Sequence, residues 1–232
     1  YLHCIYKIED MTNSITFEDI KNSNEIRTYI KQADASLQVL GFTEHSFAHA
    51  TKCADIAGRL LSDLDYSNRE VELAKIAAYM HDIGNVVNRA DHAQSGAVMA
   101  FRILDKMGMP VEDTATVITA IGNHDEATAF PVNAVAAALI IADKTDVRRS
   151  RVRDKKTIVS DIHDRVNYAV EKAELNLDRE TKTLFLILKI DTDICPVMEY
   201  FEIFLERMLL SRKAAESLGL TFKLNINGSI LL

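Results

Sequence analysis

A histidine and an aspartate stand side by side at His81-Asp82, directly after a helix-like apolar stretch over residues 71–80. Imidazole and carboxylate together form a ligand set that suits divalent metal ions. More side chains of these two types recur at positions compatible with helices: His45, His49, His92, His124 and Asp143. One His-Asp pair is a weak signal, but this ordered set predicts a metal site built from distant parts of the chain.

Helices are expected to position these side chains. Residues 67–70 have the capping-box pattern, in which a serine or threonine is followed three residues later by an acidic side chain, and residues 16–19 repeat it. The box at 67–70 starts the helix that delivers His81-Asp82. Gly84 follows, and we expect it to end this helix with a positive φ.

The other histidines fall near predicted helix starts. His45 and His49 are four residues apart and therefore on one helical face, with Thr43 as the expected cap. Asp91 is expected to cap a later helix that carries His92 in its first turn.

Two prolines mark the next two helices. Pro110 opens a segment that leads to His124, and Pro131 opens a strongly apolar helix over residues 132–142 with Asp143 near its end. Successive helices joined by short connections predict an α-helical core.

The pattern changes after about residue 160. We expect a helix, two strands joined by a polar turn, a long helix closed by Gly219, and a last strand, over residues 161–172, 173–177, 184–190, 196–218 and 220–226. The predicted fold class is therefore mostly α, with a helical core at residues 15–160 and a small C-terminal α+β appendage at residues 161–232, ordered strand-strand-helix-strand.

This arrangement resembles the HD superfamily of metal-dependent phosphohydrolases, over about residues 40 to 155. The matching features are His45-Ser46, His81-Asp82-Ile83-Gly84, and Asp143 after an apolar helix. His92 and the segment 122–126 extend the likeness toward members that hold two or three metals. The resemblance implies the helical HD-type fold.

The resemblance also implies a ligand set. One ion would be held by four side chains: His45, His81, Asp82 and Asp143. Asp82 is the candidate bridge to a second ion, which His92 and His124 would bind. The cofactor would be one or two divalent ions, and nitrogen-rich ligation favours Fe, Mn, Zn or Co over Mg.

Some positions depart from the family pattern. His49 falls where the family usually has an apolar residue, so a core or rim histidine is the expectation and a ligand the alternative. Gly41 stands where the members that cleave cyclic dinucleotides carry a metal-binding glutamate, and their Gly-Tyr-Pro signature is absent. A third metal and a cyclic-dinucleotide substrate are therefore not expected.

A basic run follows Asp143. On a continuous helix, Lys144, Arg148, Arg151 and Lys155 would share one face. Two interpretations are open: a phosphate clamp over the metals, with Lys144 and Arg148 acting in catalysis beside Asp82, or a solvated face paired with acidic neighbours.

Bulk properties narrow the class of protein. The net charge of −7 argues against a general nucleic-acid binder, and three widely spaced cysteines suggest free thiols in a reducing compartment. No apolar run reaches the roughly 18 residues of a membrane span, and no signal-peptide pattern is visible, so we expect no membrane association and a cytoplasmic location.

Together these features predict a metal-dependent phosphohydrolase, a phosphomono- or phosphodiesterase. Metal-activated water would attack a small phosphorylated substrate, with a nucleotide as one candidate. The alternative is a catalytically silent HD scaffold that binds a ligand or regulates a partner. No nucleic-acid partner is expected, and a homodimer is compatible with the sequence.

Overall fold

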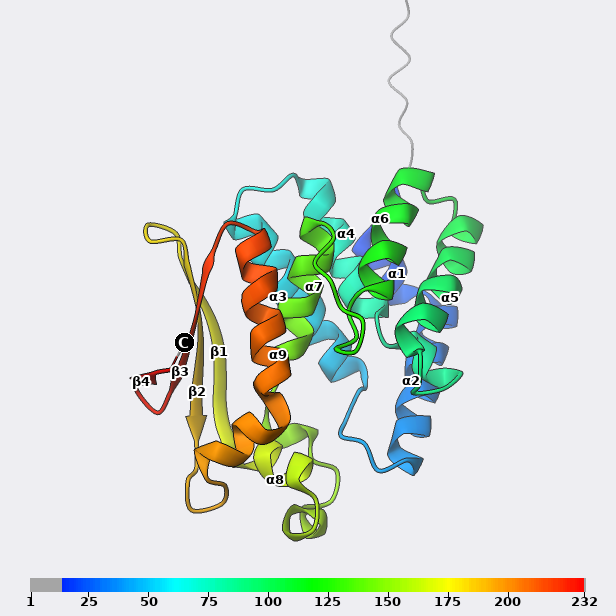
Figure 1. Ribbon diagram of the computed structural model, residues 1–232. Helices are drawn as coiled ribbons and strands as arrows, with labels where there is room; N and C mark the ends of the chain where they lie inside the picture. Colours follow the sequence, from blue (N-terminus) through cyan, green and yellow to red (C-terminus); the bar gives the residue numbers. More distant parts are fainter. Residues whose placement is uncertain (1–13, 232) are drawn as a thin grey trace, which may run out of the picture.

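The computed structural model describes residues 14–231, and most of this chain is helical (Figure 1). The first part forms a helical core of seven α-helices and one short 3-10 helix: α1 (Phe17–Asn22), α2 (Asn24–Val39), α3 (Phe47–Asp63), α4 (Asn68–Met80), η1 (Ile83–Val86), α5 (His92–Met107), α6 (Val111–Gly122) and α7 (Ala134–Lys144). The mostly helical fold class is confirmed.

The second part contains the sheet. Its elements are η2 (Arg149–Arg151), η3 (Lys155–Val159), α8 (Ile162–Ala169), β1 (Val170–Asp178), β2 (Thr183–Ile190), α9 (Val197–Ser217), β3 (Thr221–Ile226) and β4 (Ser229–Ile230). The strands lie in the order β1-β2-β3-β4, with β2 and β3 parallel and the other pairs antiparallel. Helix α9 makes the crossover that a parallel pair requires.

Local capping chemistry fixes several helix starts. The capping boxes at Thr16 and Ser67 form as predicted, each hydroxyl accepting from the backbone N–H three residues later. The expected cap of α3 was wrong, because Ser46 and not Thr43 accepts the first N–H, so His45 precedes the helix. Asp91 lies at the start of α5 but makes no side-chain cap.

Helix α7 lies in the middle of the core. It begins at Ala134 rather than residue 132, because the Asn133 side chain accepts from the Ala136 N–H and sets the first turn. All side chains from Val135 to Ala142 are buried, as expected for a helix that is apolar all round. It packs against α3, α4, α6 and α9, so its last turn places Asp143 at the centre of the molecule.

Gly84 does not end α4 with a positive φ, which corrects the expectation from sequence; it lies within η1. Its reason for being glycine is close packing. A Cβ there would lie 2.0 Å from the His92 carbonyl oxygen and 2.5 Å from the Gly96 nitrogen. The missing side chain therefore lets η1 approach α5 and brings Asp82 close to His92.

The C-terminal sheet packs onto the core through α9, which lies between the strands and α7 (Figure 1). Tyr200, Phe204 and Met208 are buried on this helix. The predicted helix at 161–172 was too long, because the chain pairs with β2 from Val170 onward. Strand β4 was not predicted; it follows the turn at Asn227-Gly228, where both residues have a positive φ.

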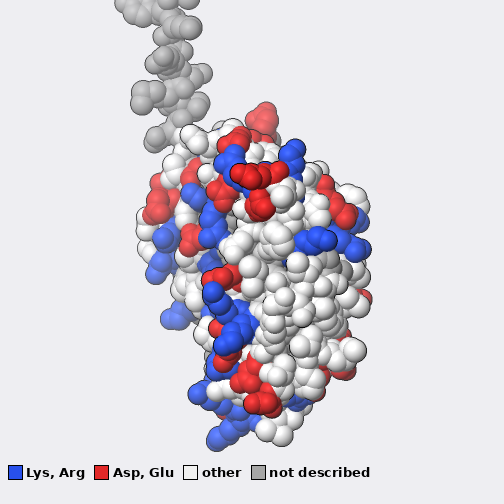
Figure 2. Space-filling model, turned by 90° about the vertical axis from the view of Figure 1, so that its left-hand side faces the viewer, with Lys and Arg blue, Asp and Glu red and all other residues white. Residues whose placement is uncertain are grey.

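Figure 2 views the molecule from the side on which the sheet lies, and uncharged atoms cover much of this face between groups of charged side chains. Cys53 and Cys195 are buried free thiols, and Cys4 lies outside the described residues. None of the helices within residues 14–231 has the length and apolar character needed to cross a bilayer.

Candidate metal centre

Histidine and aspartate side chains from five helical segments meet near the C-terminal end of α7. Ligating atoms lie within 4.8 Å of one another in four overlapping groups: His49/His81/Asp82, His49/Cys53/Asp143, His81/His124/Asp143 and Asp82/His92/His124. Most of these side chains are buried. The described chain thus brings together all but one of the ligands predicted from sequence, and it adds His49.

At one end of the cluster, two imidazoles face the same two carboxylates. His49 Nε2 lies 3.4 Å from Asp143 Oδ1 and 3.7 Å from Asp82 Oδ2. His81 Nε2 lies 3.1 Å from Asp82 Oδ2 and 3.8 Å from Asp143 Oδ1. Ligands bound about 2.1 Å from one ion are separated by roughly 3.0–3.5 Å. The atoms of His49, His81 and Asp82 form one of the four groups, and Asp143 Oδ1 lies beside both imidazoles, so a divalent ion held by the first three would be next to Asp143.

The His81 ring shows how well a cation fits here. Its Nδ1 lies 2.7 Å from the Ala78 carbonyl oxygen, so Nδ1 donates, while no group of residues 14–231 forms a hydrogen bond with the buried Nε2. Burial opposes protonation of the ring, but Asp82 outweighs it and raises the pKa of His81. The carboxylates thus draw positive charge toward Nε2, and a metal ion would supply it in place of a proton.

The other end of the cluster contains His92 and His124. Their Nδ1 atoms contact the carbonyl oxygens of Arg89 and Ile121 at 3.0 and 2.6 Å, and their Nε2 atoms lie only 3.2 Å apart. Burial, with nearby His81 and Lys144, lowers the pKa of His124 to about 3, so this ring is neutral at pH 7. Two Nε2 lone pairs then face each other, which a bridging cation would relieve.

Asp82 lies between the two ends. Its Oδ2 faces His81, and its Oδ1 lies 3.5 Å from His92 Nε2. Asn85 donates to Asp82 Oδ1 at 2.8 Å and holds the carboxylate in place. Asp82 is thus the carboxylate that faces both ends of the cluster, and its role as a bridge between two ions stays a prediction.

Sequence reasoning missed Asp146. Its fully buried carboxylate accepts from His49 Nδ1 at 2.8 Å and pairs with Lys52 at 2.8 Å and with Arg148 at 3.1 Å. Burial would raise the pKa of Asp146, but the contact with His49 and the charges of Arg151 and Lys52 hold it well below the usual range. A carboxylate behind a histidine orients the ring and strengthens it as a ligand. Only its position three residues after Asp143 connects it to the predicted set.

His45 and His49 differ from the expectation. His49 lies in the first turn of α3 and points into the core, whereas His45 precedes the helix and its Nδ1 contacts the Thr43 carbonyl oxygen at 2.7 Å. His45 borders a small cavity together with Asp82 and Asp143 but belongs to none of the four groups. The two ring centroids are 5.5 Å apart.

The basic run does not form a helical face, because α7 ends at Lys144 and an irregular segment follows. Lys144 is buried and pairs with Asp143 at 2.6 Å and Glu126 at 3.1 Å. Arg148 pairs with Glu44 and Asp146 and does not border the cavities around the cluster. The contacts of Arg148 thus favour a structural role over the predicted catalytic one.

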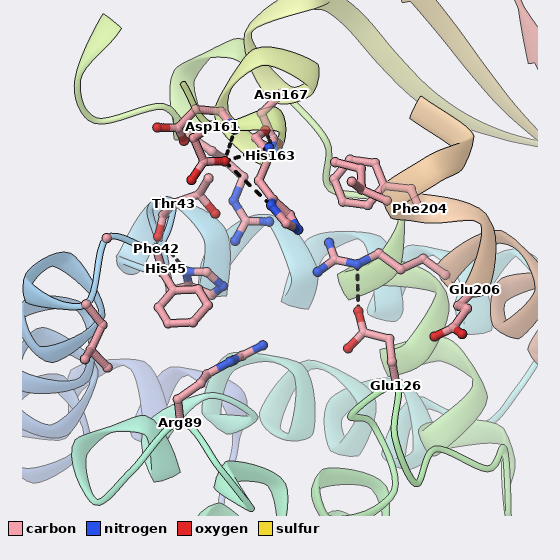
Figure 3. A pocket seen from close by; sticks show the side chains of 16 residues that line it. Phe42, Thr43, His45, Arg89, Glu126, Asp161, His163, Asn167, Phe204 and Glu206 are labelled. Atoms are coloured by element: carbon pink, nitrogen blue, oxygen red, sulfur yellow. Dashed lines mark hydrogen bonds and ion pairs between the residues drawn. The ribbon is translucent and has the colours of Figure 1, made fainter. Parts of the chain in front are cut away.

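A cleft of about 500 Å³ opens beside the cluster, between the helical core and helices α8 and α9. Figure 3 shows His45, Arg89 and Glu126 entering it from the core, with Asn167 and Phe204 opposite. It adjoins the small cavity over the ligands, since His45, Arg89, Arg151 and Arg207 border both. A small molecule in this cleft would reach the ligand cluster.

A buried His/Asp cluster within a helical core could hold a metal ion, and comparison with known families matches the part of the chain that contains it. Residues 43–148 match the family model described as HD domain. This chain therefore contains an HD domain, the metal-dependent phosphohydrolase type of fold, and such domains bind divalent metals.

The chain is also similar to an uncharacterized protein of Methanocaldococcus jannaschii. It is 25% identical over 209 residues, covering 79% of this chain and 80% of the relative. No solved structure matches the chain.

Proposed function

We propose that this protein is a metal-dependent phosphohydrolase that acts on a small phosphorylated molecule. The observation that carries the proposal is the orphaned His81 Nε2, buried and facing two carboxylates beside an equally placed His49. A divalent ion held by these residues would lower the pKa of a coordinated water and would neutralise charge on phosphoryl oxygens. The HD domain supports this reaction class.

The ligands divide into two sets that share Asp82. His49, His81, Asp82 and Asp143 would hold one ion, and Asp82, His92 and His124 a second. The proposal assigns Fe, Mn, Zn or Co to these sites, because imidazole nitrogens dominate the donor set.

The protein's own groups have separate roles. Asp82, held by Asn85, would orient the attacking water and accept its hydrogen bond. Lys144 stays protonated: burial opposes this, but Asp143 and Glu126 raise its pKa. Its charge offsets that of Asp143 beside the phosphate. The cleft of about 500 Å³ is within the range of small-molecule sites, so the proposed substrate is a small molecule.

The test combines metal analysis with a substrate panel. Wild type and Asp82→Ala would be loaded separately with Mn, Fe, Co or Zn and assayed on nucleotides and simple phosphate esters. We expect hydrolysis by wild type and its loss in Asp82→Ala together with lower metal content. An active, metal-replete Asp82→Ala protein contradicts the proposal, and ligand binding without turnover across the panel indicates a silent HD module instead.

A further inference from the structure

Two arginines from opposite sides of the cleft border the small cavity over the ligand cluster. Arg89 belongs to the segment between η1 and α5 in the core, and Arg207 belongs to α9, which carries the sheet. Both also line the larger cleft (Figure 3 shows Arg89 pointing into it). An anion passing from the cleft to the metal ligands would therefore lie close to both guanidinium groups.

Arg89 reaches the edge of the ligand cluster. Its Nη1 lies 3.4 Å from His92 Nε2, 3.3 Å from Asn85 Oδ1 and 4.0 Å from Asp82 Oδ1. The guanidinium also stacks on the Phe42 ring, 5.4 Å from its centroid. This cation–π contact favours the position of the group, and no carboxylate within residues 14–231 comes closer to it than the 4.0 Å contact with Asp82. Its capacity to bind an anion is therefore largely unused.

One edge of the Arg207 guanidinium is paired with a carboxylate, and its other edge borders the cavity. Its Nε pairs with Glu126 Oε1 at 2.6 Å, and the guanidinium stacks on Phe204, 4.7 Å from its centroid. Glu126 in turn pairs with Lys144, which pairs with Asp143. In the described chain the two terminal nitrogens of Arg207 make no hydrogen bond, and they form the fork that matches phosphate oxygens.

The other cations near the cluster are already engaged. Lys144 has two carboxylate partners, and Arg148 is tied to Glu44 and Asp146. Arg151 donates to the carbonyl oxygens of Glu44 and Asp146. Arg89 and Arg207 differ from these neighbours because they are partly exposed, at 27% and 26% of the side chain against 4% for Arg151, and keep terminal nitrogens without a carboxylate partner within hydrogen-bond distance in the described chain.

We propose that Arg89 and Arg207 clamp the phosphate group of the substrate, and that the favoured ligand is a phosphate monoester dianion. This inference rests on the proposed function, since it places the phosphate beside the metal ligands. Two guanidinium groups in addition to the metal charge fit a dianion better than a singly charged diester. The organic part would occupy the cleft between Phe42 and Phe204. Helix α9 then contributes directly to the active site, with Arg207 as a specificity-determining residue.

The experiment measures binding of inorganic phosphate to the Mn²⁺-loaded protein by calorimetry, with metal content determined on the same samples. The variants are Arg89→Ala and Arg207→Ala. Arg212→Ala is the matched control, because Arg212 lies on α9, is half exposed and does not line the cleft. We expect each clamp variant to bind phosphate about 10- to 100-fold more weakly, the effect of one charged hydrogen-bond partner, with unchanged metal content. The control should match wild type.

Phenyl phosphate and diphenyl phosphate, tested as competitors of inorganic phosphate, provide the second measurement. Wild type should favour the monoester at least tenfold, and Arg207→Ala should lose most of that preference. Unchanged phosphate affinity in either variant overturns the clamp. Loss of metal together with phosphate in Arg207→Ala also overturns it, because Arg207 would then act only through Glu126 and Lys144.

The two proposals fail in different ways. A wild-type protein that binds Mn²⁺ and phosphate but hydrolyses nothing contradicts the phosphohydrolase assignment, while an Arg207-dependent phosphate affinity still supports the clamp. A protein that hydrolyses esters equally well with and without Arg207 contradicts the clamp alone.

Discussion

The two ends of the ligand cluster are built differently. At the His49 end, the ring is backed by the buried carboxylate of Asp146, and neither His49 nor His81 borders the cavity. At the His92 end, the Nδ1 atoms of both rings contact backbone carbonyls and both rings border the cavity, and His92 Nε2 lies 3.4 Å from Arg89 Nη1. A carboxylate-backed, enclosed site should bind its ion more tightly. We therefore expect a resident ion at the first end and a weaker, substrate-facing ion at the second.

The largest effect is expected from removing His49. His49→Ala deletes one of four donors to the enclosed ion, so metal affinity should fall by at least about 100-fold, beyond the 10- to 100-fold typical of outer contacts. Calorimetric titration with Mn²⁺ or Zn²⁺ measures this change. His45→Ala is the control, since His45 lies outside the four ligand groups. If His45→Ala loses the tight ion and His49→Ala keeps it, the assignment of these two histidines is reversed.

A smaller effect on metal binding is expected at the His92 end of the cluster, which borders the cavity. His92→Ala should remove the weaker equivalent and leave the tight one within about threefold of wild type, because separate sites respond nearly independently. Metal stoichiometry at increasing free Mn²⁺ tests this, with two equivalents expected for wild type and one for the variant. Loss of both equivalents would show that the ends do not bind independently.

Asp146→Asn tests the carboxylate behind His49. The amide keeps the size of the side chain but removes the charge that His49 Nδ1, Lys52 and Arg148 contact. We expect a 10- to 100-fold loss of affinity for the tight ion. Glu44→Gln is the matched control, because Glu44 also pairs with Arg148 but does not touch His49. Equal losses in both variants would indicate general damage to the cluster of charges.

A structural feature could be predicted from the sequence where the residues that produce it are close together along the chain. The capping boxes at Thr16 and Ser67 involve groups within a few residues of each other, so their patterns were sufficient. The His/Asp set followed from residue type and order. The proposed boundary near residue 160 stays a prediction.

Other features needed the three-dimensional structure. Asp146 meets His49 across 97 residues, and Arg207 reaches the site from a helix beyond the matched HD segment. Helical spacing could not separate His45 from His49, because the helix begins only at Phe47. The prediction that the basic residues after Asp143 share one helical face was wrong for a similar reason. Residues four apart lie on one face only within a continuous helix, and α7 ends at Lys144.

The smallest effect on metal binding is expected from Gly84→Ala, which touches no ligand. The new Cβ would collide with backbone atoms of His92 and Gly96, so η1 must move away from α5. Overpacking of this kind costs about 1–3 kcal/mol, measurable by urea unfolding. Because the shift separates Asp82 from His92, binding of the weaker ion should weaken, less than in His92→Ala, while the tight ion is unaffected.

Gly122→Ala is the control for this change. A Cβ at Gly122 meets only the Ala97 Cβ, at an ordinary 3.7 Å, and Gly122 lies in a helix, where alanine is favoured. This variant should be as stable as wild type or slightly more stable. If Gly84→Ala is equally stable and keeps both ions, the close contact between η1 and α5 does not set the distance between the two ends of the cluster.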